Sequence, residues 1–347
     1  MSVAIIATVV VFYVLAVGKD LLVPFAVAVM IWYIINALSR WYARVFRLAG
    51  GRVNWITLFS SVMTITIFAA LIVNMVENNI ADVAAAAPGY KANLDRLIAK
   101  LSGLFGFEQV PTVSHFIDNI DIASVITRLA GALTGILGNI GLIVIYVVFL
   151  LFEQNTFDLK ISRLFAQPGR QQQVRGVLVH MQQEIQSYIS TKTMISISTG
   201  ILGYVVLKLV GVDYAEFWAF TIVLFNFIPT IGSIAATVFP ALLTLIQFDT
   251  FTPFLIVAAG LGVIQFVLGS VIEPKLMGST LNLSPLVVLL SLALWGSVWG
   301  IAGMFLCVPI TVIALIALSH FPPTQPIAVL LSSSGTLKNA AAPEPTA

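Results

Sequence analysis

Two interruptions in long apolar segments bring together the side chains of this sequence that could bind a solute. In the first, Pro229 and Gly232 break the apolar segment 217–248, and neutral polar residues flank the break: Asn226, Thr230 and Ser233. Their amide and hydroxyl groups could hydrogen-bond a solute that carries hydroxyls or an amine, or could bind a cation stripped of water. They could equally satisfy the backbone carbonyls that Pro229 leaves without a donor.

The second interruption lies within residues 283–319, where tryptophans and glycines recur: Trp295, Gly296, Trp299, Gly300 and Gly303. Gly296 and Gly300 are four residues apart, a spacing that lets another backbone approach a helix closely. The two tryptophans could anchor the chain at a membrane interface. Because they stand next to a break, they could instead wall a cavity.

Glu273 and Gln265 form a third group of candidate residues, on one long apolar segment. Ionisable groups inside a membrane are costly and are functional by default. Desolvation raises the pKa of a carboxyl group and an opposite charge lowers it, so Glu273 could exchange a proton as its surroundings change. Lys275 would oppose this exchange by lowering that pKa. The alternative is an interfacial Glu–Lys pair at a helix end that Pro274 terminates.

Gln186 and Lys192 stand where a polar segment meets an apolar one. They could gate access to the membrane interior, or Lys192 could extend its ammonium group to the interface. The sequence has no H-E-x-x-H, G-x-S-x-G or G-x-x-x-x-G-K pattern, and its three histidines are far apart. We therefore expect no catalytic residue, no metal site and no cofactor.

The composition places these residues in a membrane. Hydrophobic residues make up 59% of the chain and charged residues 9%, against about 25% charged in an ordinary soluble domain. Several apolar runs reach the roughly 20 residues that cross a bilayer as a helix. These runs are apolar on every face, unlike alternating strands. The sequence therefore predicts an all-α polytopic membrane protein with no nucleic-acid partner.

Basic clusters set the orientation of the predicted helices. Four arginines without an acid place the segment 40–52 in the cytoplasm, and alternation then leaves both termini there. In chain order we predict N-terminal transmembrane helices over 1–76, an extracytoplasmic amphipathic helical region over 77–128, a fourth transmembrane helix over 129–153, a cytoplasmic polar helical linker over 154–192, a core of two helix-plus-broken-hairpin units over 193–320 and a disordered tail over 321–347.

Two apolar segments are too long to be single spans. Residues 217–248 would form a helix of about 48 Å, well beyond a hydrocarbon core of roughly 30 Å, and residues 283–319 would form a longer one. Each holds a break near its middle and follows a simple span, 193–210 or 250–272. We therefore predict about six full transmembrane helices plus two broken or re-entrant hairpins, related as an inverted repeat. Eight ordinary spans are the alternative.

These motifs are similar to those of the autoinducer-2 exporter family of bacterial membrane transporters. The resemblance rests on Ile-Pro-x-Ile-Gly-Ser at 228–233, on Gln265, Glu273 and Pro274, and on Trp-Gly-x-x-Trp-Gly-x-x-Gly at 295–303. It implies a multi-pass protein of the bacterial cytoplasmic (inner) membrane and a homo-oligomer, with pentamers suggested. Members export the quorum-sensing furanosyl signal autoinducer-2 or act as sodium or proton antiporters, so the fold alone does not identify the substrate.

The main hypothesis is a secondary transporter or exporter of a small polar solute, bound between the two breaks and working in the lipid bilayer. Autoinducer-2 is the candidate solute, with Na+ or H+ as candidate coupling ions. A sodium(lithium)/proton antiporter of the same family is the first alternative. The second alternative is a membrane scaffold or signalling subunit that binds a partner through region 77–128, which could otherwise rest on the membrane surface.

Overall fold

The computed structural model describes residues 2–46, 55–71, 74, 138–154, 156–165, 167–277 and 282–336. Within these ranges every element is a helix apart from one isolated antiparallel bridge, between Leu283 and Ser332. Four helices are long and apolar enough to cross a membrane, judged by length and composition: Lys19–Val45, Gly169–Val210, Thr252–Met277 and Pro285–Ser319. The prediction of an all-α polytopic membrane protein is therefore confirmed. The predicted region 77–128, on which the scaffold alternative rests, lies outside the described residues.

The chain divides into two compact units, of which the first comprises Met1–Val62, Asn139–Lys192 and Lys275–Ala347. Its described helices include α1 (Ser2–Val17), α2 (Lys19–Val45), the first part of Trp55–Leu71, α6 (Ile140–Glu153), α7 (Phe157–Leu164), the first part of α8 (Pro168–Val210), α13 (Pro285–Ser319), a 3-10 turn (Pro322–Thr324) and α14 (Gln325–Leu331). In this unit α2 packs against α6 and α13. Polar pairs reinforce the apolar contacts: Trp32 Nε1 donates to Gln154 Oε1 at 2.9 Å, and the Ser39 hydroxyl donates to that of Thr57 at 2.8 Å.

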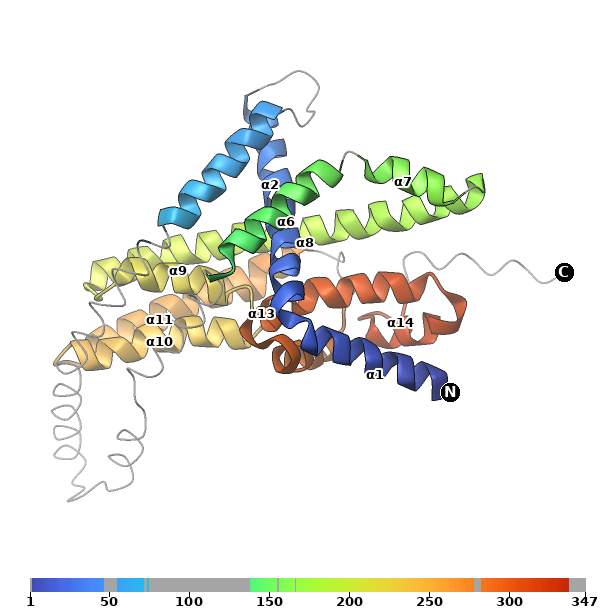
Figure 1. Cartoon of the computed structure of the whole chain (residues 1–347). Helices are drawn as coiled ribbons and strands as arrows, with labels where there is room; N and C mark the ends of the chain where they lie inside the picture. The colour runs from blue at the N-terminus through green and yellow to red at the C-terminus, as the bar shows by residue number, and fades with distance from the viewer. Residues whose placement is uncertain are drawn as a thin grey trace. The chain divides into compact units, whose positions relative to one another are not determined.

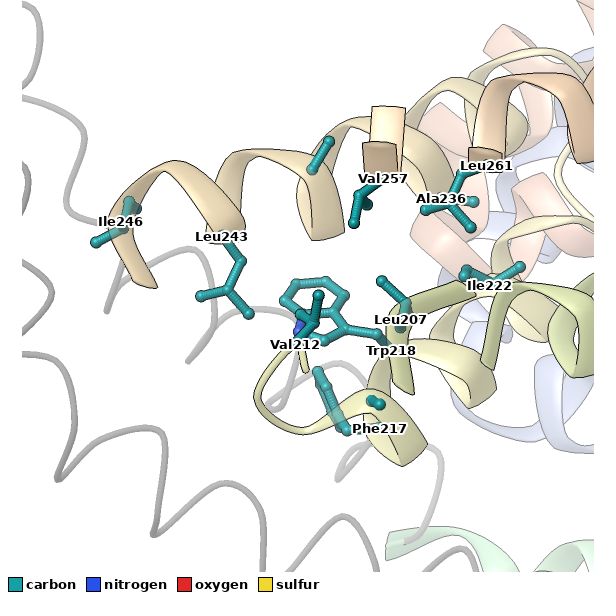
Figure 2. Packing of buried hydrophobic residues seen from close by; sticks show 12 residues of the cluster. Leu207, Val212, Phe217, Trp218, Ile222, Ala236, Leu243, Ile246, Val257 and Leu261 are labelled. Atoms are coloured by element: carbon teal, nitrogen blue, oxygen red, sulfur yellow. The ribbon is translucent and has the colours of Figure 1, made fainter. Parts of the chain in front are cut away.

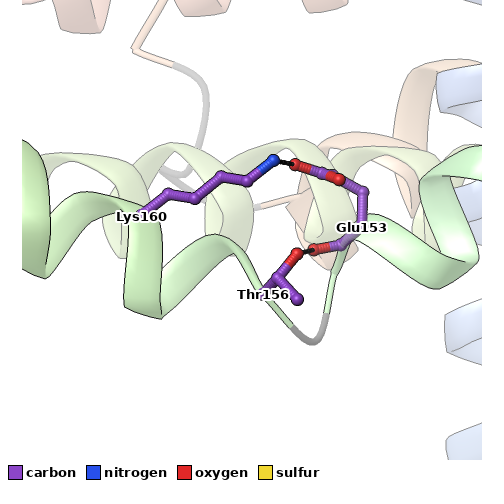
Figure 3. Close-up of polar contacts among 3 residues, drawn as sticks. All are labelled: Glu153, Thr156 and Lys160. Carbon is purple, nitrogen blue, oxygen red and sulfur yellow. Dashed lines mark hydrogen bonds and ion pairs between the residues drawn. The ribbon is translucent and has the colours of Figure 1, made fainter.

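The turn between α6 and α7 is organised around Glu153. The Thr156 hydroxyl donates to the Glu153 carbonyl at 3.0 Å, and Lys160 pairs with the Glu153 carboxylate (Figure 3). After α7, the helix α8 runs for 43 residues. Most of the segment predicted as a polar linker and the first span of the core therefore belong to one helix that passes through Thr193.

The second unit comprises Met63–Gly138 and Thr193–Pro274. Its described elements include the later part of α8, α9 (Ala215–Phe225), α10 (Ile231–Gln247), α11 (Thr252–Gln265), a π-helix (Phe266–Ile272) and the start of α12 (Glu273–Met277). Here α10 lies beside both α9 and α11 (Figure 1). Leu207, Trp218, Leu243 and Val257 of four different helices meet in its buried apolar core (Figure 2). Burial of such side chains within protein specifies how these lipid-facing helices pack.

Small residues in α8 let α9 approach closely. A Cβ on Gly200 would stand 3.0 Å from the carbonyl oxygen of Ala219, and one on Gly203 would stand 2.9 Å from Cδ1 of Ile222. Because lipid is as apolar as the side chains, close packing of this kind is a principal source of helix association in membranes.

Both long apolar segments are helix–break–helix hairpins. With 11 residues, α9 is about 16 Å long and cannot cross a hydrocarbon core of roughly 30 Å alone. In α13 the backbone leaves helical geometry at Gly300, and Gly303 then lies against the carbonyl group of Trp295. Eight residues of straight helix would separate Trp295 and Gly303 by about 12 Å, so the chain turns back on itself here.

One expectation about the end of the chain is wrong: the sequence predicts disorder from Phe321, whereas residues 322–331 form the 3-10 turn and α14. The helix α14 packs on α13, and its residue Ala328 is fully buried. The proline-rich composition of this region therefore does not prevent a short helix with an apolar face. The rest of the predicted tail, residues 337–347, lies outside the described residues.

The span predicted over 250–272 corresponds to the helical segment Thr252–Met277, which is long and apolar enough to cross a membrane. From Phe266 the hydrogen bonding in this segment changes from α to π, which the sequence does not predict.

Candidate functional site

The first break brings two helical turns so close together that one position requires glycine. After α9 ends at Phe225, the Ile231 N–H donates to the carbonyl of Pro229 at 2.6 Å. Thr230 adopts a φ of 58°, which is rare for a β-branched residue. A Cβ on Gly232 would then stand 2.8 Å from the carbonyl carbon of Phe225 and closer still to its oxygen. The first turn of α10 thus lies directly against the last turn of α9.

The three polar residues of the first break have different roles in the structure. Asn226 is 3% exposed and donates from Nδ2 to the hydroxyl of Ser196 in α8 at 3.2 Å. The Ser233 hydroxyl donates to the carbonyl of Thr230 at 2.8 Å, so it satisfies a backbone group of the break. Thr230 is exposed. Asn226 therefore holds the tip of this hairpin to α8, and sequence reasoning missed its partner Ser196.

The second break also requires glycine. Gly300 has φ 63° and ψ −141°, a combination almost confined to glycine. A Cβ on Gly303 would stand 2.6 Å from the carbonyl carbon of Trp295 and closer still to its oxygen. At Gly296 an added Cβ would meet only the flexible side chain of Met304, 3.0 Å away at Cε. The closest approach of the two half-helices is therefore at Gly303.

The two tryptophans of this break contact α1. The ring centroids of Trp295 and Trp299 are 5.2 Å apart, and Phe12 of α1 lies 6.5 Å from Trp295. Trp299 Nε1 donates to the carbonyl of Leu15 at 2.9 Å. Carbonyls in the last turn of a helix lack a helical donor, so the indole supplies one near the end of α1. Trp299 thus fastens the tip of the second hairpin to α1, a role that sequence reasoning did not foresee.

The two breaks share one local design. In each, a residue with positive φ, Thr230 or Gly300, is followed within three residues by a glycine. That glycine, Gly232 or Gly303, lies against the carbonyl of an aromatic residue in the preceding half-helix. The sequence indicates the repeat of the two hairpins only through the lengths of their segments. The structure adds residues with matching roles in the two breaks.

Gln265 and Glu273 lie at the two ends of the π-helix. Both amide atoms of Gln265 are buried and have no hydrogen-bond partner among the described residues. The backbone N–H of Glu273 donates to the carbonyl of Leu268, and Lys275 is exposed. π-Helical turns are rare and recur at functional sites. Gln265 and Glu273 thus lie on one continuous helical segment, and their roles stay predictions.

The two candidate gating residues lie on α8. Lys192 is 6% exposed and Gln186 is half-buried. A lysine this deeply buried in protein does not match the interpretation in which its ammonium group reaches out to the interface. Glu184, two turns earlier on α8, is 8% exposed and was missed, because the surrounding glutamines give the segment a uniformly polar character.

In the second unit, an ion pair joins the C-terminal end of α8 to the start of α9. Lys208 Nζ lies 2.9 Å from Glu216 Oε1, and the Tyr204 hydroxyl donates to the same oxygen at 3.1 Å. The hydrogen bond from Lys208 is the main reason that the pKa of Glu216 lies below its ordinary value. Both side chains are about half exposed, so solvent screens the pair. Among the described residues no group of three His, Cys, Asp or Glu residues could hold a metal ion.

Known proteins are similar in sequence to this chain along nearly its whole length. A family model described as AI-2E family transporter matches residues 3–322. The AI-2 transport protein TqsA of Escherichia coli (strain K12) is 32% identical over 323 residues, which are 91% of this chain and 90% of that protein. A protein of Haemophilus influenzae, provisionally named a transport protein, is 29% identical over 322 residues, 90% of each chain. PerM of Escherichia coli (strain K12), provisionally named a permease, is 26% identical over 249 residues, 72% of this chain and 69% of its own.

Proposed function

The chain belongs to the AI-2E family of transporters, and we propose that it exports a small polar solute, with autoinducer-2 as the candidate, across the bacterial inner membrane. As a member of this family it is a multi-pass membrane transporter and not an enzyme. Export, the identity of the solute and the cytoplasmic location of both termini belong to the proposal. The AI-2 transport protein TqsA, similar over 91% of the chain, supports autoinducer-2 as the first solute to test.

The observation that carries the proposal is the pair of broken hairpins. Each tip ends a half-helix and begins another, so backbone N–H and C=O groups without helical partners collect there. Irregular backbone at membrane depth survives where it lines a cavity or is buried in protein, and transporters use such half-helix ends to bind solutes. The two tips share the arrangement of a positive φ followed by a glycine against a carbonyl. A repeated device of this kind supports transport better than it supports a passive helix bundle.

The side chains near the breaks favour a polar solute without a strong charge. Around the first break the polar groups are an amide and hydroxyls, carried by Asn226, Thr230 and Ser233. The helix α10 also begins there, and the N-terminus of a helix has a partial positive charge that attracts electron-rich oxygen atoms. Asn226 acts in this proposal as a positioning residue, because its amide is bonded to Ser196.

An antiporter is the second candidate, and Glu273 is the residue that favours it. A carboxyl group at the end of a π-helix could take up and release a proton as its surroundings change. In that case Glu273→Gln would abolish ion exchange, because the amide cannot titrate. In the export proposal the same variant would retain solute flux that does not depend on a proton gradient.

Flux into inverted membrane vesicles tests the proposal. Vesicles that contain the protein should accumulate autoinducer-2 faster than vesicles without it. The double variant Pro229→Ala, Gly232→Ala should insert normally but lose most of this flux. Autoinducer-2 accumulation at the rate of empty vesicles, together with sodium-driven proton movement, would favour the antiporter. Normal flux in the double variant would show that transport does not depend on the first break.

A further inference from the structure

Gln265 has two buried hydrogen-bonding atoms without a partner in the described part of the chain. Its Oε1 and Nε2 are both buried, and neither has a partner among the described residues. Buried polar groups are nearly always paired, because an unpaired group loses its bonds to water without replacement. Within a membrane-spanning segment, lipid offers no substitute. An amide in this state is available to bond a solute.

The helix that follows Gln265 also lacks one of its backbone hydrogen-bond donors. Its seven residues form a π-helix, in which the N–H of Glu273 donates to the carbonyl of Leu268, five residues back. The next donor in this pattern would be residue 274, but Pro274 has no N–H. The carbonyl of Gly269 therefore loses its π-helical donor.

Gly269 also keeps space open beside the amide. It has no side chain, and a Cβ at this position would stand 3.9 Å from Gln265 Oε1. The amide of Gln265 thus lies along the face of its own helix on which Gly269 sits. The amide of Gln265, with its donor and its acceptor, therefore stands on the same face as a glycine whose carbonyl has lost its π-helical donor, without the bulk of a side chain between them.

We propose that Gln265 and the carbonyl of Gly269 form the hydrogen-bonding contact for the transported solute, and that this solute is uncharged and bears hydroxyl groups. The inference rests on the proposed function. A hydroxyl group both donates and accepts, so hydroxyls can satisfy Oε1, Nε2 and the carbonyl together, whereas a bare cation would satisfy the oxygens alone. A neutral amide also gives no compensation to a charged solute that leaves water.

Replacement of Gln265 by leucine separates a binding role from a structural one. The variant Gln265→Leu removes both amide atoms and keeps most of the side-chain volume. Without solute, its thermal midpoint in detergent should equal or exceed that of the wild type, because the amide has no bonds to lose. Its autoinducer-2 flux into inverted vesicles should fall by roughly 10- to 100-fold, about tenfold for each hydrogen bond lost. Gln265→Asn keeps the amide but withdraws it by one methylene, so its flux should be intermediate.

Thr199→Val is the matched control. Thr199 is also buried in the second unit, but its hydroxyl donates to the carbonyl of Ile195 at 2.8 Å. A hydroxyl with its partner inside its own helix is not available to a solute. The control should therefore transport autoinducer-2 at close to the wild-type rate.

Each outcome decides one part of the proposal. Wild-type flux in Gln265→Leu, a lower thermal midpoint in that variant without solute, or equal loss of flux in Thr199→Val would overturn the inference and leave the proposed function intact. If the wild-type protein moves sodium instead of autoinducer-2 and Gln265→Leu blocks that movement, the uncharged solute is wrong. If the wild-type protein moves neither, the proposed function fails and the inference fails with it.

Discussion

Replacing Gly303 by alanine should damage the second hairpin far more than the addition of one methyl group suggests. The new Cβ would stand 2.6 Å from the carbonyl carbon of Trp295 and 3.0 Å from Cβ of Trp299, and neither atom can rotate away. Carbon atoms pack at about 3.5–4.0 Å, so the two half-helices would have to separate by about 1 Å. Overpacking of this kind costs about 1–3 kcal/mol.

Thermal unfolding of the solubilised protein and solute flux in vesicles measure this effect. In large chains each kcal/mol lowers the apparent Tm by about 2–4 °C, so a cost of about 1–3 kcal/mol in Gly303→Ala should lower it by roughly 2–12 °C. Transport should fall as well, because the tip is displaced. Gly232→Ala should behave similarly, since a Cβ there would lie 2.8 Å from both the carbonyl carbon of Phe225 and Cβ of Ile228.

Gly262→Ala in α11 is the control for these variants. Nothing lies within 4 Å of the position that its Cβ would take. Alanine is also a better helix former than glycine, so the Tm should stay the same or rise slightly. If Gly303→Ala and Gly262→Ala have the same Tm and the same flux, the close approach of the half-helices is refuted.

The remaining predictions concern single contacts. Trp299→Phe removes the indole donor to the end of α1 and should lower the free energy of unfolding by about 0.5–1.5 kcal/mol in denaturant titrations, and an unchanged value would contradict that bond. Asn226→Ala leaves the buried Ser196 hydroxyl without its partner and should cost about 1–3 kcal/mol in the same assay, whereas a neutral effect would exclude Asn226 as the fastening of the tip. The pKa of Glu216 is lowered in the folded state, mainly by the hydrogen bond from Lys208. The ion pair therefore stabilises the fold fully at pH values above 4.5, the ordinary pKa of the carboxyl group, and this stabilisation is lost as the pH falls through the lower folded-state pKa. Glu216→Gln should therefore lower the Tm slightly at pH 7, less at high salt and not at all in strong acid, and a difference that persists in acid would rule out the ion pair.

Segment length and helix breakers predict the two hairpins from the sequence. Residues 217–248 and 283–319 exceed one bilayer crossing, and proline and glycine mark the places where each helix stops. These signals are local, so a single sequence contains them. The structure adds the reason for each glycine, because Gly232 and Gly303 lie against carbonyl groups that only a residue without a side chain can approach.

Contacts between distant residues could not be predicted in this way. The Asn226–Ser196 bond joins residues 30 apart in the sequence, and the Trp299–Leu15 bond joins residues 284 apart. Neutral hydrogen bonds have no characteristic spacing, and a backbone acceptor such as the carbonyl of Leu15 leaves no trace in residue type. Sequence reasoning therefore identified one partner of each bond and not the other.

The π-helix shows a different limit. An α-helix and a π-helix differ by one residue in hydrogen-bond register, and their apolar patterns are nearly the same over seven residues. Pro274 was interpreted as a helix terminator, which accounts for its fixed φ but not for the donor that it lacks. The polarity of Gln265 makes it a candidate from the sequence, whereas the structure adds that its buried amide has no partner among the described residues.

We propose that residues 217–248 and 283–319 re-enter the membrane from opposite sides and do not cross it. Single cysteines at Asp249 and Ser279, introduced after replacement of Cys307, the one native cysteine, test this topology with a membrane-impermeant thiol reagent on intact cells. We expect position 249 to be labelled from outside and position 279 to be labelled only after the cells are permeabilised. Labelling of position 279 from outside, with position 249 protected, would mean eight ordinary spans and would refute the re-entrant hairpins.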